Sequence, residues 1–144
     1  MKRITKFTSL LLAVILLVSV PVAYAAETAD QRASSYFMRN SAYLHGITST
    51  GFDVWFEVTA MGIMDELGVS SIRVEKSTDA VNWETVKTYY KSDYSQMIDY
   101  NSTSHSGCVS FGNRESGYYY RAYVMFYAKD NGNTGYYACY TSYI

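Results

Sequence analysis

The chain has 144 residues, with 12 basic and 13 acidic side chains and a net charge of −1 at neutral pH. Neither sign of charge forms a run, which excludes the basic footprint that nucleic acids and anionic membranes attract. Tyrosine is the compositional outlier, with 16 copies. Tyrosine favours strands and joins an apolar ring to a polar tip, so its abundance favours a sheet protein.

The first 25 residues have the pattern of a secretory signal peptide. Lys2 and Arg3 form a basic start, an apolar run follows over 10–18, and a small-x-small Ala-Tyr-Ala triplet ends at Ala25. The apolar run is too short to span a membrane, which takes about 20 residues. We therefore expect a secreted protein that is cleaved near Ala25 and has no membrane span in its mature form.

The remainder of the chain is long enough for one domain with its own core. Residues 26–40 are polar and weakly patterned, and this composition predicts a loose N-terminal leader. Residues 41–144 show neither an internal repeat nor a linker, so we expect a single domain there.

Hydrophobic periodicity predicts the first strands of this domain. A weak strand is expected over 42–47, and strict alternation of apolar and polar side chains predicts a clear strand over 52–61. Residues 62–68 differ, because Met61, Met64 and Leu67 follow one another at intervals of three. That spacing predicts one helical turn between glycines.

The rest of the chain alternates between short strands and turns. Strands are expected over 71–76 and 83–90, joined by turn-forming residues, and residues 93–106 are interpreted as a long polar connection. A short strand is expected over 108–111. Two denser strands are expected over 118–129 and 136–144, and the Asn-Gly pair between them is typical of a tight hairpin.

These elements add up to about seven short strands without a long helix. Such a pattern favours an all-β fold, an antiparallel β-sandwich of the fibronectin type III or Ig-like kind, with a jelly-roll-like sandwich as the alternative. Tyr120, followed by small and branched inward residues, is interpreted as the tyrosine of a tyrosine corner.

Several short runs resemble a family of small secreted proteins from Gram-positive, clostridia-like bacteria. The resemblance covers most of the domain and implies only the compartment and a single-domain organisation, because that family has no assigned function or catalytic residues. The runs that carry it are Met64-Asp65-Glu66-Leu67-Gly68, Ile72-Arg73-Val74-Glu75-Lys76, Trp83-Glu84-Thr85-Val86 and Gly117-Tyr118-Tyr119-Tyr120-Arg121-Ala122.

Two cysteines, Cys108 and Cys139, follow the expected signal peptide. An even cysteine count outside the cytoplasm suggests a disulfide, which would stabilise the domain by about 3 kcal/mol. Two separate buried thiols are the alternative. We predict the bridge, although spacing alone does not show whether the two strands are neighbours.

The motifs of common catalytic and metal sites are missing. His45 and His105 lack the local spacing of a metal site, and no G-x-S-x-G elbow is present. Cys108 with His105 is a weak thiol-base pair. The acidic residues Asp65, Glu66, Glu57, Glu75 and Glu84 are expected to be solvated. We therefore predict no catalytic residues, no bound cofactor and no metal ligand, and thus a protein that is not an enzyme.

The tyrosines of the last strands carry the strongest functional signal. Tyr119, Tyr123 and Tyr127 share one face of the strand over 118–129, and Tyr137 and Tyr143 are expected beside them on the next strand. Such rings stabilise a sheet through cross-strand pairs, about 0.2–1 kcal/mol each. Displayed together, they would instead form a platform for sugar rings or a partner protein.

The function predicted from the sequence is a secreted, non-catalytic binding module whose partner is an extracellular glycan or protein. A diffusible effector of the toxin or antimicrobial type is the alternative. A small hydrolase is the least favoured, because its motifs are missing. Fold class alone does not name the ligand, since sandwiches serve many functions.

Overall fold

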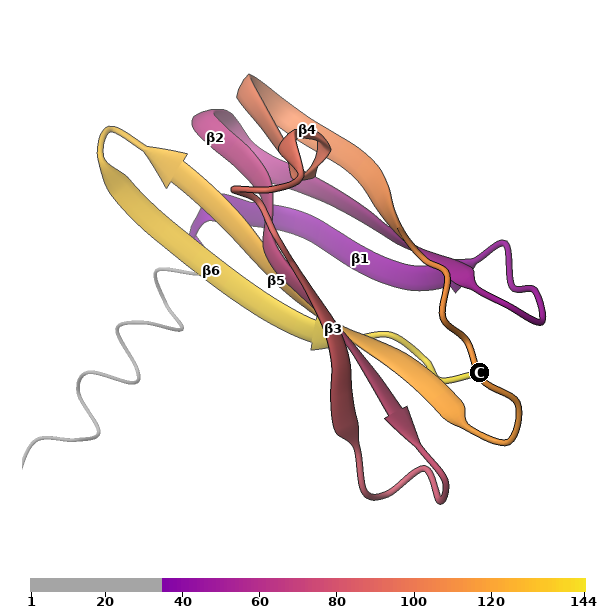
Figure 1. Cartoon of the computed structure of the whole chain (residues 1–144). Coiled ribbons are helices and arrows are strands. Elements are labelled where there is room, and N and C mark those ends of the chain that lie inside the picture. The colour runs from indigo at the N-terminus through magenta and orange to yellow at the C-terminus, as the bar shows by residue number, and fades with distance from the viewer. Residues whose placement is uncertain (1–34) are drawn as a thin grey trace, which may run out of the picture. The chain divides into compact units, whose positions relative to one another are not determined.

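The computed structural model describes residues 35–144 as one antiparallel sheet of six strands with one short 3-10 helix, η1 (Figure 1). The predicted all-β, antiparallel fold is confirmed, with six strands instead of about seven. The expected signal peptide and residues 26–34 of the expected leader lie outside the described residues. The elements are β1 (Phe37–His45), β2 (Phe52–Ser77), β3 (Glu84–Tyr90), η1 (Ser95–Met97), β4 (Ile98–Phe111), β5 (Tyr119–Asp130) and β6 (Asn133–Tyr140).

Strand β2 organises the sheet. It runs for 26 residues and pairs with four other strands. Its first half, 52–59, lies between β1 and β4, whereas 71–76 lies between β3 and β5. Of the described strands, β6 is the one that does not pair with β2; it pairs with β5. Figure 1 shows β2 bending between its two halves, so that one strand belongs to both parts of the sheet.

A bulge and a glycine lie where β2 bends. Thr59 is opposite Ser104 of β4, but Met64 is opposite Ser102, so β2 has three more residues than β4 in this interval. The extra residues protrude, and the Met61 side chain is 60% exposed. Extra residues in one strand bend it and increase its twist. Gly68 follows with a φ of +154°, in contact with the Met97 carbonyl of η1.

The predicted helical turn over 62–68 is therefore wrong. Its backbone is extended and belongs to β2. Met64 and Leu67 are buried because they point into the core, and Met61 is exposed because it lies in the bulge. The interval of three residues reflects the irregular register instead of a helix.

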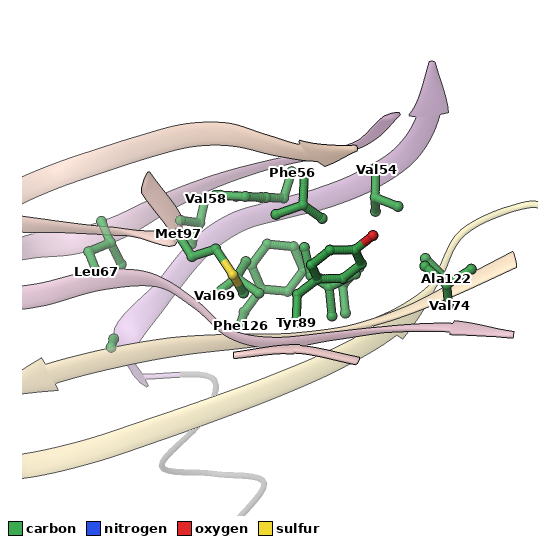
Figure 2. Packing of buried hydrophobic residues seen from close by; sticks show 14 of the residues in the cluster. Val54, Phe56, Val58, Leu67, Val69, Val74, Tyr89, Met97, Ala122 and Phe126 are labelled. Carbon is green, nitrogen blue, oxygen red and sulfur yellow. The ribbon is translucent and has the colours of Figure 1, made fainter. Parts of the chain in front are cut away.

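The core lies between the two parts of the sheet. Figure 2 shows Val54, Phe56 and Val58 from the first half of β2 facing Val69 and Phe126 from the second part of the sheet. Val74 and Val124 are also fully buried. Burial of each such side chain contributes about 1.5–3 kcal/mol, so this layer of packing holds the bent sheet closed.

Two polar segments form strands that periodicity did not reveal. Residues 37–40, which the sequence assigned to the loose leader, belong to β1. Most of 93–106, which was interpreted as a polar connection, belongs to η1 and β4. Strand β4 has few apolar residues over 99–107, and at Gly107 the space on its inner side is filled by a ring from β2. A Cβ on Gly107 would lie 2.7 Å from Cζ of Phe56, so the absence of a side chain there makes room for that ring.

The predicted disulfide is absent from the structure. Cys108 and Cys139 are both free thiols. Cys108 of β4 lies opposite Trp55 of β2, and Cys139 of β6 lies opposite Val124 of β5. Strands β4 and β6 are not neighbours, and burial raises the pKa of each thiol. The thiols therefore stay protonated at neutral pH and are weak nucleophiles.

Substitution of the bend glycine tests this geometry. We expect Gly68→Ala to lower the free energy of unfolding by about 2 kcal/mol or more, because the new Cβ would collide with the Met97 carbonyl at a positive φ. Gly62→Ala, in the open bulge of the same strand, meets no atom within 4 Å and is expected to change it by less than about 0.5 kcal/mol. Urea denaturation measures both. Equal losses of unfolding free energy in the two variants would contradict the role of Gly68 at the bend.

Tyr89 ties β3 to the core and makes the fold sensitive to alkali. Its ring is buried, and its hydroxyl donates to the Ser110 carbonyl of β4 at 2.8 Å. Burial, with a smaller contribution from Tyr94, raises the pKa of Tyr89 to about 12. The ordinary tyrosine pKa is near 10, so the unfolded chain ionises first as the pH rises.

The stability that Tyr89 contributes is therefore complete below about pH 10 and is lost as the pH rises toward about 12. Tyr89→Phe should be less stable near neutrality by about 1 kcal/mol, the value of a lost hydrogen bond. It should also lose less stability between pH 10 and 12 than the unchanged protein. Thermal unfolding at stepped pH checks this, and parallel curves for the two proteins would refute it.

Candidate functional site

The structure places Tyr119, Tyr123 and Tyr127 at every fourth position of β5, on the side of the sheet opposite the core. The residues between them, such as Tyr120 and Val124, are fully buried on the core side. We call this outer surface of β5 and β6 the tyrosine face, formed by Tyr119, Tyr123, Tyr127, Tyr136, Tyr140 and Tyr143.

On β6 the partners are Tyr136 and Tyr140 and not Tyr137. The ring centroids of Tyr127 and Tyr136 are 5.4 Å apart, and those of Tyr123 and Tyr140 are 4.9 Å apart. Tyr137 lies opposite Phe126 and so belongs to the other side of the sheet. Tyr143 lies beyond the end of β6, outside the strand expected for it, and meets Tyr119 with ring centroids 5.5 Å apart.

The hairpin turn fixes this register. Asn131 and Gly132 both have positive φ, 48° and 79°, as a two-residue turn of type I′ requires. The turn pairs Asp130 with Asn133, and counting outward from it places Tyr136 opposite Tyr127. The Asn-Gly signal in the sequence was therefore sufficient to select Tyr136 and Tyr140, had the register been counted from it.

A buried carboxylate lies beneath the middle of the tyrosine face. Glu75 of β2 is only 5% exposed, and it accepts hydrogen bonds from Nε of Arg73 at 2.7 Å and Nε of Arg121 at 2.8 Å. The hydrogen bond to Glu75 raises the pKa of Arg73 above its ordinary value. Both oxygens of this carboxylate are thus engaged with guanidinium groups, which are planar donors well matched to it.

The same two arginines lie against the rings. The guanidinium of Arg73 is 4.6 Å from the ring centroid of Tyr123. That of Arg121 lies between two rings, 4.1 Å from Trp83 and 4.0 Å from Tyr140. Cation–π contacts of this kind contribute about 0.5–2 kcal/mol each. One side of each of these rings is therefore already in contact with the protein's own cation.

A second cluster repeats the arrangement toward the hairpin end. Glu66 accepts hydrogen bonds from Nζ of Lys91 at 2.9 Å and Nζ of Lys129 at 3.1 Å. The bond from Lys91 is the largest cause that lowers the pKa of Glu66. Nζ of Lys91 also lies 3.6 Å from the ring centroid of Tyr127, which is buried. Tyr123, Tyr127 and Tyr140 thus each contact a cation of the protein, whereas the tyrosines at the margins of the face, Tyr119, Tyr136 and Tyr143, contact none within residues 35–144.

An open cleft of about 450 Å³ adjoins one of these margins. We call it the Trp83 cleft. Trp83 connects it to the tyrosine face, because its ring centroid is 6.1 Å from that of Tyr143. The lining residues come from the β2–β3 hairpin and the start of β5, and they are Lys76, Ser77, Thr78, Asn82, Trp83, Glu84 and Tyr118.

Lys76 is the cation of the Trp83 cleft. Its Nζ donates to Glu115 at 3.0 Å, lies 3.5 Å from a carboxylate oxygen of Glu84, and is 4.4 Å from the ring centroid of Tyr118. The hydrogen bond to Glu115 is the largest cause that raises the pKa of Lys76. Lys76 therefore stays charged at neutral pH and faces two carboxylates, which leaves these three groups with a net charge of −1.

The turn that forms one wall of the cleft is held by a carboxylate. Oδ1 of Asp79 accepts hydrogen bonds from the N–H groups of Val81 and Asn82 and from the Ser77 hydroxyl. The backbone bond from Asn82 is the largest cause that lowers the pKa of Asp79 well below its ordinary value. The wall is therefore fixed before any ligand arrives, which limits the entropy lost on binding.

The other residues singled out from the sequence do not converge. His105 of β4 packs its ring against Phe56 on the core side and bonds the Gln96 carbonyl at 2.9 Å. Cys108, three positions along the same strand, lies on the opposite side, so the thiol-base pair is not formed. The three glutamates also lie apart. Glu57 is near β1, Glu75 is beneath the tyrosine face, and Glu84 is at the Trp83 cleft.

A separate ring pair on the first part of the sheet escaped the sequence analysis. Tyr43 of β1 stacks on Trp55 of β2 with centroids 6.5 Å apart, and His45 meets the same tryptophan edge-on at 6.1 Å. Neither the Trp83 cleft nor a second cleft, lined by residues that include Val86 and Phe111, is lined by Tyr43, His45 or Trp55. It therefore serves below as a comparison for the Trp83 cleft.

Comparison with protein families, curated proteins and solved structures gives no match. The resemblance to small secreted proteins of Gram-positive bacteria therefore stays a prediction. Within residues 35–144 no group of three or more His, Cys, Asp or Glu side chains is placed to hold a metal ion. The same residues contain no helix with the length and hydropathy needed to cross a bilayer.

The buried carboxylate gives a direct test of the tyrosine face. We expect Glu75→Gln to lower the free energy of unfolding by about 2 kcal/mol, because both arginines lose their charged acceptor. Glu57→Gln, an exposed carboxylate on the same strand without a hydrogen bond or ion pair within the described residues, should change it by less than about 0.5 kcal/mol. Urea denaturation followed by tryptophan fluorescence distinguishes them. If Glu75→Gln left the free energy of unfolding unchanged, the hydrogen bonds of Glu75 would not be what holds the tyrosine face in place.

Proposed function

We propose that the protein is a secreted binding module that holds an extracellular glycan in the Trp83 cleft. The observation that carries the proposal is the lining of the cleft, in which two aromatic rings, Trp83 and Tyr118, lie among hydrogen-bonding side chains. The expected secretion and the absence of catalytic motifs, both drawn from the sequence, support the same function.

Sugars need this combination of groups. A pyranose ring presents a face of C–H groups that packs on an aromatic ring, and hydroxyl groups around its rim that must find hydrogen-bond partners. Thr78 and Asn82 supply neutral partners, and Lys76 and Glu84 supply charged ones, whereas the buried Ser77 hydroxyl is already bonded to Asp79. The cleft volume of about 450 Å³ lies within the range of about 300–1,000 Å³ usual for small-ligand sites.

The exposed rings beside the cleft extend the surface that a glycan chain would follow. Tyr143 lies against Trp83, and Tyr119 lies against Tyr143, so three rings continue from the cleft onto the tyrosine face. Arg121 lies against one side of the Trp83 ring, whereas Tyr119 and Tyr143 contact no cation within residues 35–144. We infer that one sugar occupies the cleft and that neighbouring sugars of the same chain pack along this line.

The charge of the cleft narrows the class of glycan. The charged residues that line the cleft, Lys76 and Glu84, sum to zero, and Glu115 beside Lys76 adds a negative charge, which disfavours sugars that carry carboxylate or sulfate groups. We therefore propose a neutral polysaccharide as the ligand, or one with free amino groups.

We also propose that the bent sheet belongs to the sandwich class, with its two parts as the two layers. A single strand shared by both layers is typical of orthogonal packing, in which strands change sheets at bends or bulges. The bulge at residues 61–63 supports this assignment. Fibronectin type III and Ig-like sandwiches pack their sheets in an aligned way, so the orthogonal variant is the form we favour.

Binding to glycans tests the proposal. The unchanged protein should co-sediment with an insoluble neutral polysaccharide or with peptidoglycan, and Trp83→Ala should weaken binding at least tenfold, which corresponds to about 1.4 kcal/mol. Glu84→Gln, an exposed substitution that leaves the fold intact, should weaken it several-fold.

Tyr43→Ala is the matched control, because it removes an exposed ring from the other part of the sheet. It should leave binding unchanged. Circular dichroism of each variant confirms folding. If no glycan is bound, or if Trp83→Ala binds as well as the unchanged protein, the proposal fails. Growth inhibition of bacteria in the absence of glycan binding would favour the diffusible effector instead.

A further inference from the structure

Strand β6 ends the sheet, and half of its backbone groups point to the free edge. Within residues 35–144 it pairs with β5 alone. The Thr141 N–H donates to the Ala122 carbonyl at 2.9 Å, which identifies the hydrogen-bonded pairs of this ladder. Because such pairs alternate in antiparallel strands, the even-numbered residues of β6 turn their N–H and C=O groups outward. These residues are Thr134, Tyr136, Ala138 and Tyr140.

The β6 edge differs from the other strands in its lack of protection. Free edges are normally guarded by charged side chains or proline, which prevent pairing with another chain. Strand β1 has Arg39, β3 has Glu84 and Lys87, and β4 has Asp99. The sequence of β6, NTGYYACY, has neither a charge nor a proline over eight residues.

We propose that the β6 edge is a homodimer interface, where β6 pairs antiparallel with β6 of a second copy about a two-fold axis at Tyr137. This register is the one that uses every outward-facing residue. It places Thr134 opposite the partner's Tyr140, and Tyr136 opposite the partner's Ala138. A two-fold axis makes the same contacts twice, so each copy contributes all four outward residues.

Tyr137 is the residue at the centre of this arrangement. Its side chain is 45% exposed and makes no ring contact within residues 35–144, unlike Tyr136 and Tyr140. On the axis it would lie opposite the partner's Tyr137 in a non-hydrogen-bonded pair, the closer of the two antiparallel pair types. Aromatic pairs in such positions stabilise sheets, which gives this exposed ring a role.

A second copy fits this edge better than an unrelated extended peptide. The strand is complementary to itself in the one register that satisfies all its outward groups, and an uncharged strand brings no like charges together. Pairing also joins the tyrosine faces of the two copies, because Tyr136 and Ala138 lie on the same side of the sheet. The inference is independent of the proposed glycan binding, although a dimer would present two Trp83 clefts to one polymer.

Sedimentation velocity of the purified protein tests the interface. The unchanged protein should sediment as a dimer, with about twice the mass of one chain, and Tyr137→Phe should do the same. Tyr137→Lys should sediment as a monomer, because two ammonium groups would lie opposite each other on the axis. A monomeric unchanged protein at every concentration tested, or a dimeric Tyr137→Lys, would overturn the proposal.

A cross-link tests the register. Non-hydrogen-bonded pairs have Cα atoms about 4.5 Å apart, within the range that a disulfide spans. In a background with Cys108→Ser and Cys139→Ser, Tyr137→Cys should form an intermolecular disulfide on mild oxidation. Tyr100→Cys, an exposed position on β4, should stay monomeric on a non-reducing gel. Equal cross-linking at both positions, or at neither, would contradict a two-fold axis at Tyr137.

Discussion

The pairing of one strand with four others is the constraint on which this structure depends. Strand β2 carries β1 and β4 on its first half and β3 and β5 on its second half. Strand β6 does not pair with β2 and joins the sheet through β5. The core can close only if β2 bends, and the bulge at 61–63 and the contact of Gly68 with the Met97 carbonyl accompany that bend. The tyrosine face and the Trp83 cleft both lie on the second part of the sheet, so their placement follows from it.

Internal pairing of charges then decides which aromatic rings are free. Glu75 and Glu66 each hold two cations, and most of those cations lie against the rings of Trp83, Tyr123, Tyr127 and Tyr140. The middle of the tyrosine face is therefore part of the structure's own packing. Tyr119 and Tyr143, which continue from the Trp83 cleft, contact no cation within residues 35–144, and Trp83 lines the cleft although Arg121 lies against its ring. This is why the cleft beside Trp83, and not the broad row of tyrosines, carries the proposed function.

The sequence predicted elements whose signals are local. Alternation over 52–61 and 118–129 identified strands that the structure contains, and the Asn-Gly pair identified the β5–β6 hairpin. It failed where a distant strand supplies the constraint. The polar strand β4 pairs with β2 through its backbone, and the extended conformation of 62–68 is set by its neighbours. Trp83 and Arg121 meet only through tertiary structure, so nothing in their sequence positions indicated the Trp83 cleft.

Amide hydrogen exchange along β2, followed by NMR, tests most directly the claim that one strand joins both parts of the sheet. Residues of both halves, such as Val54 and Val74, should exchange only through global unfolding and so report the same free energy. Rapid exchange is expected only at the bulge of residues 61–63. If the first half opened at a much lower free energy than the second, or residues 62–68 showed the protection of a helical turn, the account of a single shared strand would be wrong.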